Sequence, residues 1–137
     1  MKTWKQNLKN MVPLDYIVFI DVPMKSSAKG DFIDLKPEVL DFLAAKAILQ
    51  NKIPLRGKEV NFLRKVLGLS LEKFANKLDL SSGTVFHWEK SENTRLSLVN
   101  EVAVRVFTAE QLNIEISPKF SDLVGVNVRE LKVSAAS

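Results

Sequence analysis

The stretch LRKVLGLSLEKFANKLDLSSGTVFHWEK, residues 63–90, decides the fold. Its apolar residues recur at helical spacing in three short runs separated by two tight breaks, with the middle break at Asp79–Leu80. Gly68 is suited to end the first run as a helix, and Ser70 and Ser81 are suited to cap the next two helices. This is the layout of a helix-turn-helix, whose second helix lies in the major groove of DNA.

Ten apolar positions of this stretch are predicted to form a core where three helices cross. Ala75 is small, as expected where the turn brings two helix backbones close together. Phe74 and Trp88 are predicted to be core aromatics rather than base-stacking groups. The ten positions are Leu63, Val66, Leu67, Leu69, Phe74, Ala75, Leu78, Leu80, Val85 and Trp88.

Charge is concentrated on the same part of the chain. The whole chain of 137 residues carries a net charge of +4, whereas residues 52–77 alone hold seven basic residues against Glu59 and Glu72, a net charge of +5. A localised basic surface attracts a phosphate backbone, although such lysines more often only solvate a helix face. Because these residues lie on a predicted helix-turn-helix, we expect them to attract a phosphate backbone. The seven are Lys52, Arg56, Lys58, Arg64, Lys65, Lys73 and Lys77.

Composition excludes several classes of protein. Apolar residues make up 46% of the chain, which is enough to build a packed core. The chain has no cysteine, so disulfides, thiol chemistry and cysteine zinc sites are excluded. Its start, MKTWKQNLKN, does not resemble a signal peptide, and no apolar run approaches the ~20 residues that cross a bilayer. We therefore expect a cytoplasmic protein with no membrane partner.

The N-terminal part is predicted to form a small module of mixed structure. The β-branched and aromatic residues of 16–22 predict a strand that is closed by Pro23, and 32–35 predicts a second strand of a hairpin. Helical spacing predicts a helix over 37–50. Residues 1–10 are polar and basic and are predicted to form a loose helix or arm.

The C-terminal part is predicted to begin with a long helix over 98–112. Part of its apolar stripe would close the helix-turn-helix core, and the remainder could pair with a second protomer. The tail is expected to hold a short strand or irregular packing and to fray after Val133. The stripe consists of Val99, Val102, Ala103, Val106 and Phe107.

These elements predict a mainly α fold, a five-helix-type repressor domain with a small N-terminal appendage made of a β-hairpin and a helix. The predicted domains are 1–52 for the hairpin and helix, a partner-binding or dimerisation module, 53–113 for the helix-turn-helix domain, and 114–137 for the tail.

The residues of the central stretch resemble a known family. Residues 57–90 are similar to the Cro/repressor-type helix-turn-helix family and, within it, to the C-terminal half of the MqsA and HigA kinds of antitoxin. The likeness rests on GKEVNFLRKVLGLS, on Phe74–Ala75, and on Thr84–Val85 followed by Trp88–Glu89. It covers residues 55–90 well and 16–112 loosely.

The resemblance implies a set of DNA-contacting positions. Ser82, Gly83 and His87 correspond to side chains that the family presents to base edges, with Thr84 and Phe86 beside them. Helical geometry agrees, because positions 82, 83, 86 and 87 lie opposite Val85 and Trp88, although Phe86 could equally pack under the predicted helix over 98–112. The full set of predicted DNA-binding residues is Arg56, Lys58, Ser70, Lys73, Ser81, Ser82, Gly83, Thr84, Phe86, His87 and Lys90.

Other positions follow or depart from the family. Arg64 and Glu89 correspond to a structural ion pair that links the first helix to the end of the third. The family commonly has Gln after the capping Ser70, where this chain has Leu71, so one expected phosphate contact is missing. MqsA holds zinc in its N-terminal module with paired cysteines, and this chain has none, so the zinc role does not carry over.

Catalysis and metal binding have little support in the residues. His87 is the only histidine and has no cysteine or second histidine with which to form a metal site, and it has no evident nucleophile beside it. Asp15, Asp21, Asp31 and Asp34 lie around the predicted hairpin and are expected to be solvated turn residues. We expect no enzyme activity and no cofactor.

Three functions remain. The first is a sequence-specific regulator, a dimeric repressor that binds a palindromic operator in double-stranded DNA. The second, compatible with the first, is the antitoxin of a type II toxin–antitoxin pair, in which residues 13–50 would block a small ribonuclease toxin. The third is a protein-interaction module that neutralises a partner and keeps the helix-turn-helix only as a scaffold.

Overall fold

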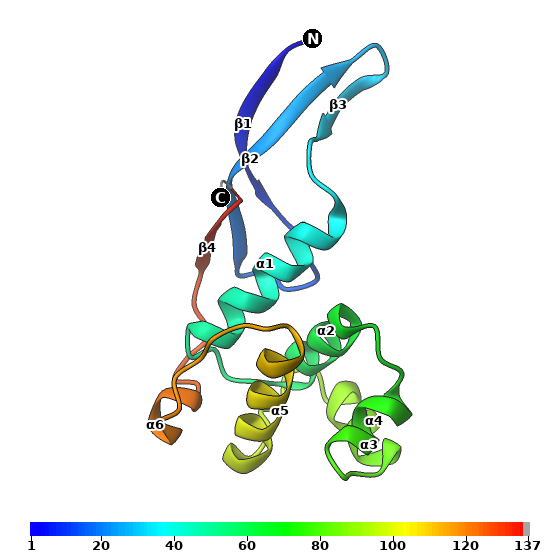
Figure 1. The fold of residues 1–137 in the computed structure, drawn as a ribbon, viewed down its shortest axis with the longest axis vertical. Coiled ribbons are helices and arrows are strands. Elements are labelled where there is room, and N and C mark those ends of the chain that lie inside the picture. Colours follow the sequence, from blue (N-terminus) through cyan, green and yellow to red (C-terminus); the bar gives the residue numbers. More distant parts are fainter. Residues whose placement is uncertain (136–137) are drawn as a thin grey trace. The chain divides into compact units, whose positions relative to one another are not determined.

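The computed structural model describes residues 1–135 of the chain (Figure 1). They form two compact units, one made of Met1–Ala47 and the residues from Arg129 on, and one made of Ile48–Val128. We call the first the sheet unit and the second the helical unit. The segment that the sequence assigned to a single tail, 114–137, is therefore divided between both units.

One long strand lies at the centre of the sheet unit. This strand, β2, pairs antiparallel with β1 along one edge. Its other edge is shared, because β3 pairs antiparallel with the last four residues of β2 and β4 pairs parallel with the first four. The strands are β1 (Thr3–Lys9), β2 (Ile17–Ser27), β3 (Gly30–Ile33) and β4 (Leu131–Ser134).

Two predictions for the strands were wrong. Residues 1–10 form mainly β1 instead of a loose helix or arm. The strand predicted to close at Pro23 continues to Ser27. The Pro23 carbonyl accepts a hydrogen bond from the Asp34 N–H at 2.8 Å, and Asp34 lies just beyond the end of β3. In an antiparallel pair, the N–H and the carbonyl of one residue point to the same side. Pro23 is therefore tolerated, because its missing N–H would face the chain just beyond the end of β3.

Helix α1 (Pro37–Gln50) has the bounds that the sequence predicted. It begins at a proline, whose fixed φ and missing N–H suit the first turn of a helix. Its first eleven residues belong to the sheet unit, where Leu40, Ala44 and Ala45 are buried.

The predicted fold class, a mainly α five-helix repressor domain, was wrong. The described residues contain six helices and a four-stranded mixed sheet, and helices hold 44% and strands 21% of the chain, which makes the fold α/β. The prediction counted only the two strands of a hairpin. It missed β1, and it did not pair the C-terminal strand β4 with β2.

Five helices make up the helical unit. The first three form the helix-turn-helix, and the predicted helix end at Gly68 and the predicted caps at Ser70 and Ser81 are confirmed. α3 packs on α4, and α2 packs on both α4 and α5. The helices are α2 (Gly57–Leu67), α3 (Leu71–Lys77), α4 (Ser82–Lys90), α5 (Leu98–Gln111) and α6 (Phe120–Leu123).

The core of the helical unit lies where these helices cross. Of the ten predicted core positions, Leu63, Phe74, Ala75 and Val85 are fully buried, and the other six are half-buried. The ring of Phe74 on α3 meets Phe107 on α5 edge to face, with ring centroids 5.9 Å apart. This contact fastens α5 to the helix-turn-helix.

The apolar stripe predicted on α5 is divided, because Phe107 packs inward on Phe74 while other members of the stripe are exposed. Val99 is 73% exposed and Val106 is 40% exposed, whereas the buried face carries Glu101, Arg105 and Thr108 together with Val104 and Ala109. A buried charge must find a partner, and here each one does. The carboxylate of Glu101 accepts hydrogen bonds from the backbone N–H groups of Leu55 and Gly125 at 2.9 and 2.7 Å and from the Arg95 guanidinium.

Arg105 is the largest fully buried side chain of the described residues. Its guanidinium donates to four backbone carbonyls, those of Ile48, Leu49, Ile53 and Leu123. Arg105 therefore ties the end of α1 and the turn after it to α6.

Among residues 1–135, no helix is both long and apolar enough to cross a membrane.

Candidate nucleic-acid interface

The turn between α3 and α4 is held by local hydrogen bonds. Asp79 adopts a left-handed conformation with φ of 56°, which Asp tolerates better than most residues, and the Leu80 N–H donates to the Ala75 carbonyl at 2.9 Å. The caps are present, because Ser70 Oγ accepts from the Lys73 N–H and Ser81 Oγ accepts from the Thr84 N–H, both at 3.2 Å.

An ion pair joins α2 to the end of α4, as the resemblance implied. The Arg64 guanidinium donates through Nε and Nη2 to the two oxygens of Glu89 at 2.7 and 2.9 Å. Its Nη1 also donates to the Leu69 carbonyl at 2.9 Å, and Asn61 donates to Glu89 at 2.6 Å. The hydrogen bond to Glu89 raises the pKa of Arg64. The pair thus fixes α4 relative to α2 and to the start of the α2–α3 turn.

Gly57 brings the start of α2 against the end of α4. The Lys58 N–H donates to the Glu92 carbonyl at 3.1 Å, and the Gly57 N–H donates to the Thr94 carbonyl at 3.3 Å. A Cβ at Gly57 would lie 1.9 Å from the Trp88 carbonyl oxygen, so only glycine permits this approach.

Helix α4 leaves one continuous face uncovered. Ser82, Gly83, Phe86, His87 and Lys90 are exposed, whereas Val85 is buried. Neighbouring members of this set differ by one, three or four in residue number, so they lie on one face and form a single stripe along the helix. The stripe has the length and the side chains with which such a helix reads base edges.

The structure gives a clearer position to three predicted DNA-contacting residues. Phe86 is 54% exposed, so it does not pack under α5, and its ring is free to contact another molecule. The hydroxyls of Ser81 and Thr84 lie 2.9 Å apart and bond to each other. Ser81 and Thr84 therefore act first as the cap of α4.

The basic residues around this stripe are only partly free. Arg56 is held by Glu59 through two hydrogen bonds of 2.9 and 2.7 Å, and Lys52 is paired with Asp122 at 3.3 Å. Together with Arg64, three of the seven cations of residues 52–77 are thus neutralised locally. Among residues 1–135, no ion pair involves Lys58, Lys65, Lys73, Lys77 or Lys90.

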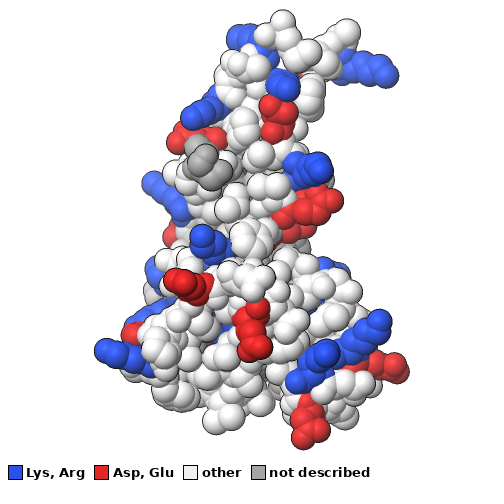
Figure 2. Space-filling model, in the orientation of Figure 1, with Lys and Arg blue, Asp and Glu red and all other residues white. Residues whose placement is uncertain are grey.

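The surface over α3 and α4, at the lower right of Figure 2, shows basic side chains interspersed with acidic ones. On a surface with mixed charges, phosphates are attracted by a few individual lysines and not by a uniformly positive potential. The residues that would hold DNA are therefore exposed lysines of the helix-turn-helix, Lys73 on α3 and Lys90 on α4, with Lys58 half-buried at the start of α2.

The groups considered for chemistry do not come together. Residues 1–135 contain no cluster of three or more His, Asp or Glu side chains that could hold a metal. The acidic residues around the hairpin are surface groups, and Asp34 forms an ion pair with Lys25 at 3.3 Å. His87 lies exposed on α4.

Sequence reasoning missed polar residues that hold the helical unit together. Asn61 bonds to Glu89 at the end of α4, and Glu101 and Arg105 bond to backbone groups around α5, yet none of the three was singled out. The signal that could have revealed them is the pair Glu101 and Arg105, four residues apart on one helix face that otherwise carries apolar residues. Comparison of the chain with protein-family models, with curated proteins and with solved structures found no match.

Proposed function

We propose that this protein is a sequence-specific DNA-binding regulator that catalyses no reaction and acts by occupying a promoter. The observation that carries the proposal is the exposed stripe of α4, formed by Ser82, Gly83, Phe86, His87 and Lys90 on a capped helix-turn-helix. The likeness of residues 57–90 to the Cro/repressor-type family points the same way. A role on the chromosome also implies a cytoplasmic protein.

In this proposal, α4 enters the major groove and its residues divide the work of recognition. The Ser82 hydroxyl and the His87 imidazole each offer a donor and an acceptor to base edges, and Phe86 contacts a thymine methyl. Gly83 lets the backbone approach closely, since nothing but Ser81 Oγ, at 3.9 Å, lies near the position of its missing Cβ. Lys73 and Lys90 contact phosphates, which adds affinity without sequence preference.

This division of roles predicts different effects for two kinds of variant. Ser82→Ala and His87→Ala are each expected to weaken a preferred site by about 1–3 kcal/mol and to relax its sequence preference. Lys73→Ala should weaken preferred and random DNA alike and reduce the salt dependence of binding. Titration of each variant with a selected duplex and a scrambled duplex measures both effects. Unchanged affinity of Ser82→Ala and His87→Ala for the selected duplex would disprove the assignment of α4.

We further propose that the regulator is a homodimer that pairs through the uncovered face of α5. Leu98, Val99 and Val106 are 46%, 73% and 40% exposed, and Ala103 between them is exposed too. Over these turns the face carries no charged residue, and the surface over α5 in the lower centre of Figure 2 is largely uncharged. A twofold axis brings identical patches together, which a charge-free apolar face allows without repulsion.

An acidic residue on this face is expected to separate the protomers. Val99→Asp should convert a dimer to a monomer, because each protomer would bring an unpaired carboxylate into a desolvated interface. Val126→Asp is the matched control, since Val126 is 70% exposed but lies outside α5. Light scattering coupled to gel filtration reads the mass of each variant. A wild-type monomer, or a Val99→Asp protein that still forms dimers, would contradict the proposal.

A second candidate function is neutralisation of a partner protein, such as the small ribonuclease of a toxin–antitoxin pair. It is favoured by three exposed apolar residues of the sheet unit, Phe32, Val39 and Phe42, which are 44%, 38% and 36% exposed. Exposed aromatic residues of this kind are common anchors of protein interfaces. The test is co-expression with the protein encoded by the adjacent gene. Joint purification that is lost in Phe32→Asp would support this function, and the absence of joint purification would oppose it.

A further inference from the structure

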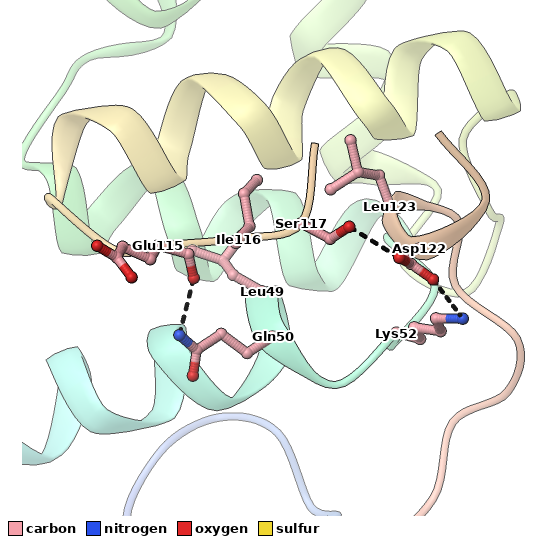
Figure 3. A pocket seen from close by; sticks show the side chains of 8 residues that line it. All are labelled: Leu49, Gln50, Lys52, Glu115, Ile116, Ser117, Asp122 and Leu123. Atoms are coloured by element: carbon pink, nitrogen blue, oxygen red, sulfur yellow. Dashed lines mark hydrogen bonds and ion pairs between the residues drawn. The ribbon is translucent and has the colours of Figure 1, made fainter. Parts of the chain in front are cut away.

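A hollow of about 450 Å³ opens on the helical unit, between the end of α1, the segment that follows α5, and α6 (Figure 3). Its size falls within the range of sites that enclose small molecules. Leu49 and Leu123 are buried and line it together with the half-buried Ile116, which gives the hollow an apolar wall. A short aliphatic group would fit against these three side chains.

Opposite charges lie at one end of the same hollow (Figure 3). Lys52 Nζ is 3.3 Å from Asp122 Oδ1, and the Ser117 hydroxyl donates to Asp122 Oδ2 at 2.7 Å. The Ser117 hydroxyl and the Lys52 ammonium lower the pKa of Asp122, so its carboxylate is ionised at neutral pH. The two charged side chains are 41% and 40% exposed, and such ion pairs are weakly held in water. A ligand that brings its own ammonium and carboxylate can therefore replace the pair.

The backbone at Lys52 is in an uncommon conformation. Its φ is 53°, in the left-handed region. The other non-glycine residues with positive φ are all Asn or Asp, which tolerate this region, whereas lysine has no such tolerance. The conformation belongs to the turn that brings Lys52 to the mouth of the hollow. The other residues are Asn10, Asp21, Asp79 and Asn113.

The walls of the hollow are held in place before any ligand arrives. Arg105 donates to the carbonyls of Leu49 and Leu123, which both line the hollow, and Gln50 Nε2 donates to the Glu115 carbonyl at 2.9 Å across the far end. A site held by such hydrogen bonds is largely pre-formed, which reduces the cost of ordering it when a ligand binds.

We propose that this hollow binds a small zwitterion with an aliphatic side chain, that is, an aliphatic amino acid. Its carboxylate would bind Lys52, its ammonium group would bind Asp122, and its side chain would lie against Leu49, Ile116 and Leu123. The lining of the hollow favours this class over a neutral or singly charged ligand, because both charges and the apolar wall are present within one hollow.

The position of the hollow suggests what the ligand does. The Val126 N–H donates to the Lys52 carbonyl at 2.9 Å, and the neighbouring Gly125 is bonded to both Glu101 and Arg95. Glu101 also holds the Leu55 N–H, two residues before α2 begins. A ligand that moves Lys52 or Asp122 therefore acts on the segment that sets the start of α2. This regulatory part rests on the proposed function, whereas the binding itself does not.

The test is calorimetric titration of the full chain, without DNA, with L-leucine, L-isoleucine and L-valine. We expect at least one of them to bind, and at least tenfold weaker binding in Lys52→Met and in Asp122→Asn. Lys77→Met is the matched control, because Lys77 is an exposed lysine of the helical unit that does not line the hollow, and this variant should bind like the wild type. Isovalerate and isoamylamine, which each lack one of the two charges, should bind at least tenfold more weakly than the amino acid.

Two results would overturn the proposal. One is the absence of binding heat with all three amino acids at concentrations up to about 10 mM, where even weak sites fill. The other is binding that is unchanged in both Lys52→Met and Asp122→Asn, with circular dichroism showing that both variants are folded. Because DNA is absent from this experiment, failure of the proposed DNA binding would leave its result intact. A second titration, of DNA with and without the bound amino acid, then tests the regulatory part alone.

Discussion

Replacing Arg105 with methionine is expected to lower the free energy of unfolding by about 4 kcal/mol, which is a large part of the stability of a domain of this size. Methionine has a similar length and keeps the aliphatic contacts. It removes the guanidinium N–H groups that donate to the carbonyls of Ile48, Leu49, Ile53 and Leu123. Those carbonyls belong to the backbone and stay buried, so their desolvation is no longer offset. Urea unfolding followed by circular dichroism measures the change.

Arg95→Met is the matched control for this prediction. Arg95 also bonds to Glu101, at 3.0 and 3.2 Å, but its side chain is 35% exposed, so water can take its place. We expect a loss of about 1 kcal/mol. A loss in Arg105→Met no larger than in Arg95→Met would show that the buried guanidinium is not what holds the end of α1 to α6.

Replacing Gly57 with alanine is expected to cost about 3 kcal/mol or more, although alanine is the better helix former. The new Cβ would lie 1.9 Å from the Trp88 carbonyl oxygen and 2.7 Å from that of Ser91. Both are backbone atoms, so no side-chain rotation relieves the clash. Separating α2 from the end of α4 would also strain the Arg64–Glu89 pair. Thermal unfolding measures the loss of stability, and a DNA titration at low temperature measures the loss of affinity.

Gly83→Ala gives the opposite expectation at another helical glycine. Gly83 lies in α4, and the nearest atom to an added Cβ, Ser81 Oγ, is 3.9 Å away. The variant should gain about 0.5–1 kcal/mol of stability from the lower entropy of its unfolded chain. If Gly57→Ala were as stable as Gly83→Ala, the close approach of α2 to the end of α4 would be wrong.

The helical part of the fold could be predicted because its signals are local. The helices α1 to α4 begin at a proline, at a glycine or behind a serine cap, and the prediction of their positions from these residues and from the apolar spacing is confirmed. The pair Arg64–Glu89 could be predicted from a resemblance alone, since the two residues lie 25 positions apart.

The rest depended on contacts that no local pattern encodes. β1 carries only two apolar residues, Trp4 and Leu8, so it lacks the alternation that marks a half-buried strand. β4 is four residues long, and its partner lies more than a hundred positions away in the chain. The apolar pattern of α5 did not reveal that Glu101 and Arg105 are buried. A count of apolar residues takes charged residues to be exposed, whereas here both side chains bond to buried backbone groups.

The most direct test of the central claim is selection of bound duplexes from a random DNA library by the purified full chain at near-physiological salt. The account predicts enrichment of an inverted repeat whose half-sites are centred about one helical turn, ~34 Å, apart, as two α4 helices of a dimer require. Because phosphate contacts alone give no preference, enrichment of one sequence would report contacts from the α4 stripe to base edges. A folded protein that enriches no sequence would contradict the account and leave the helix-turn-helix as a scaffold for binding a protein partner.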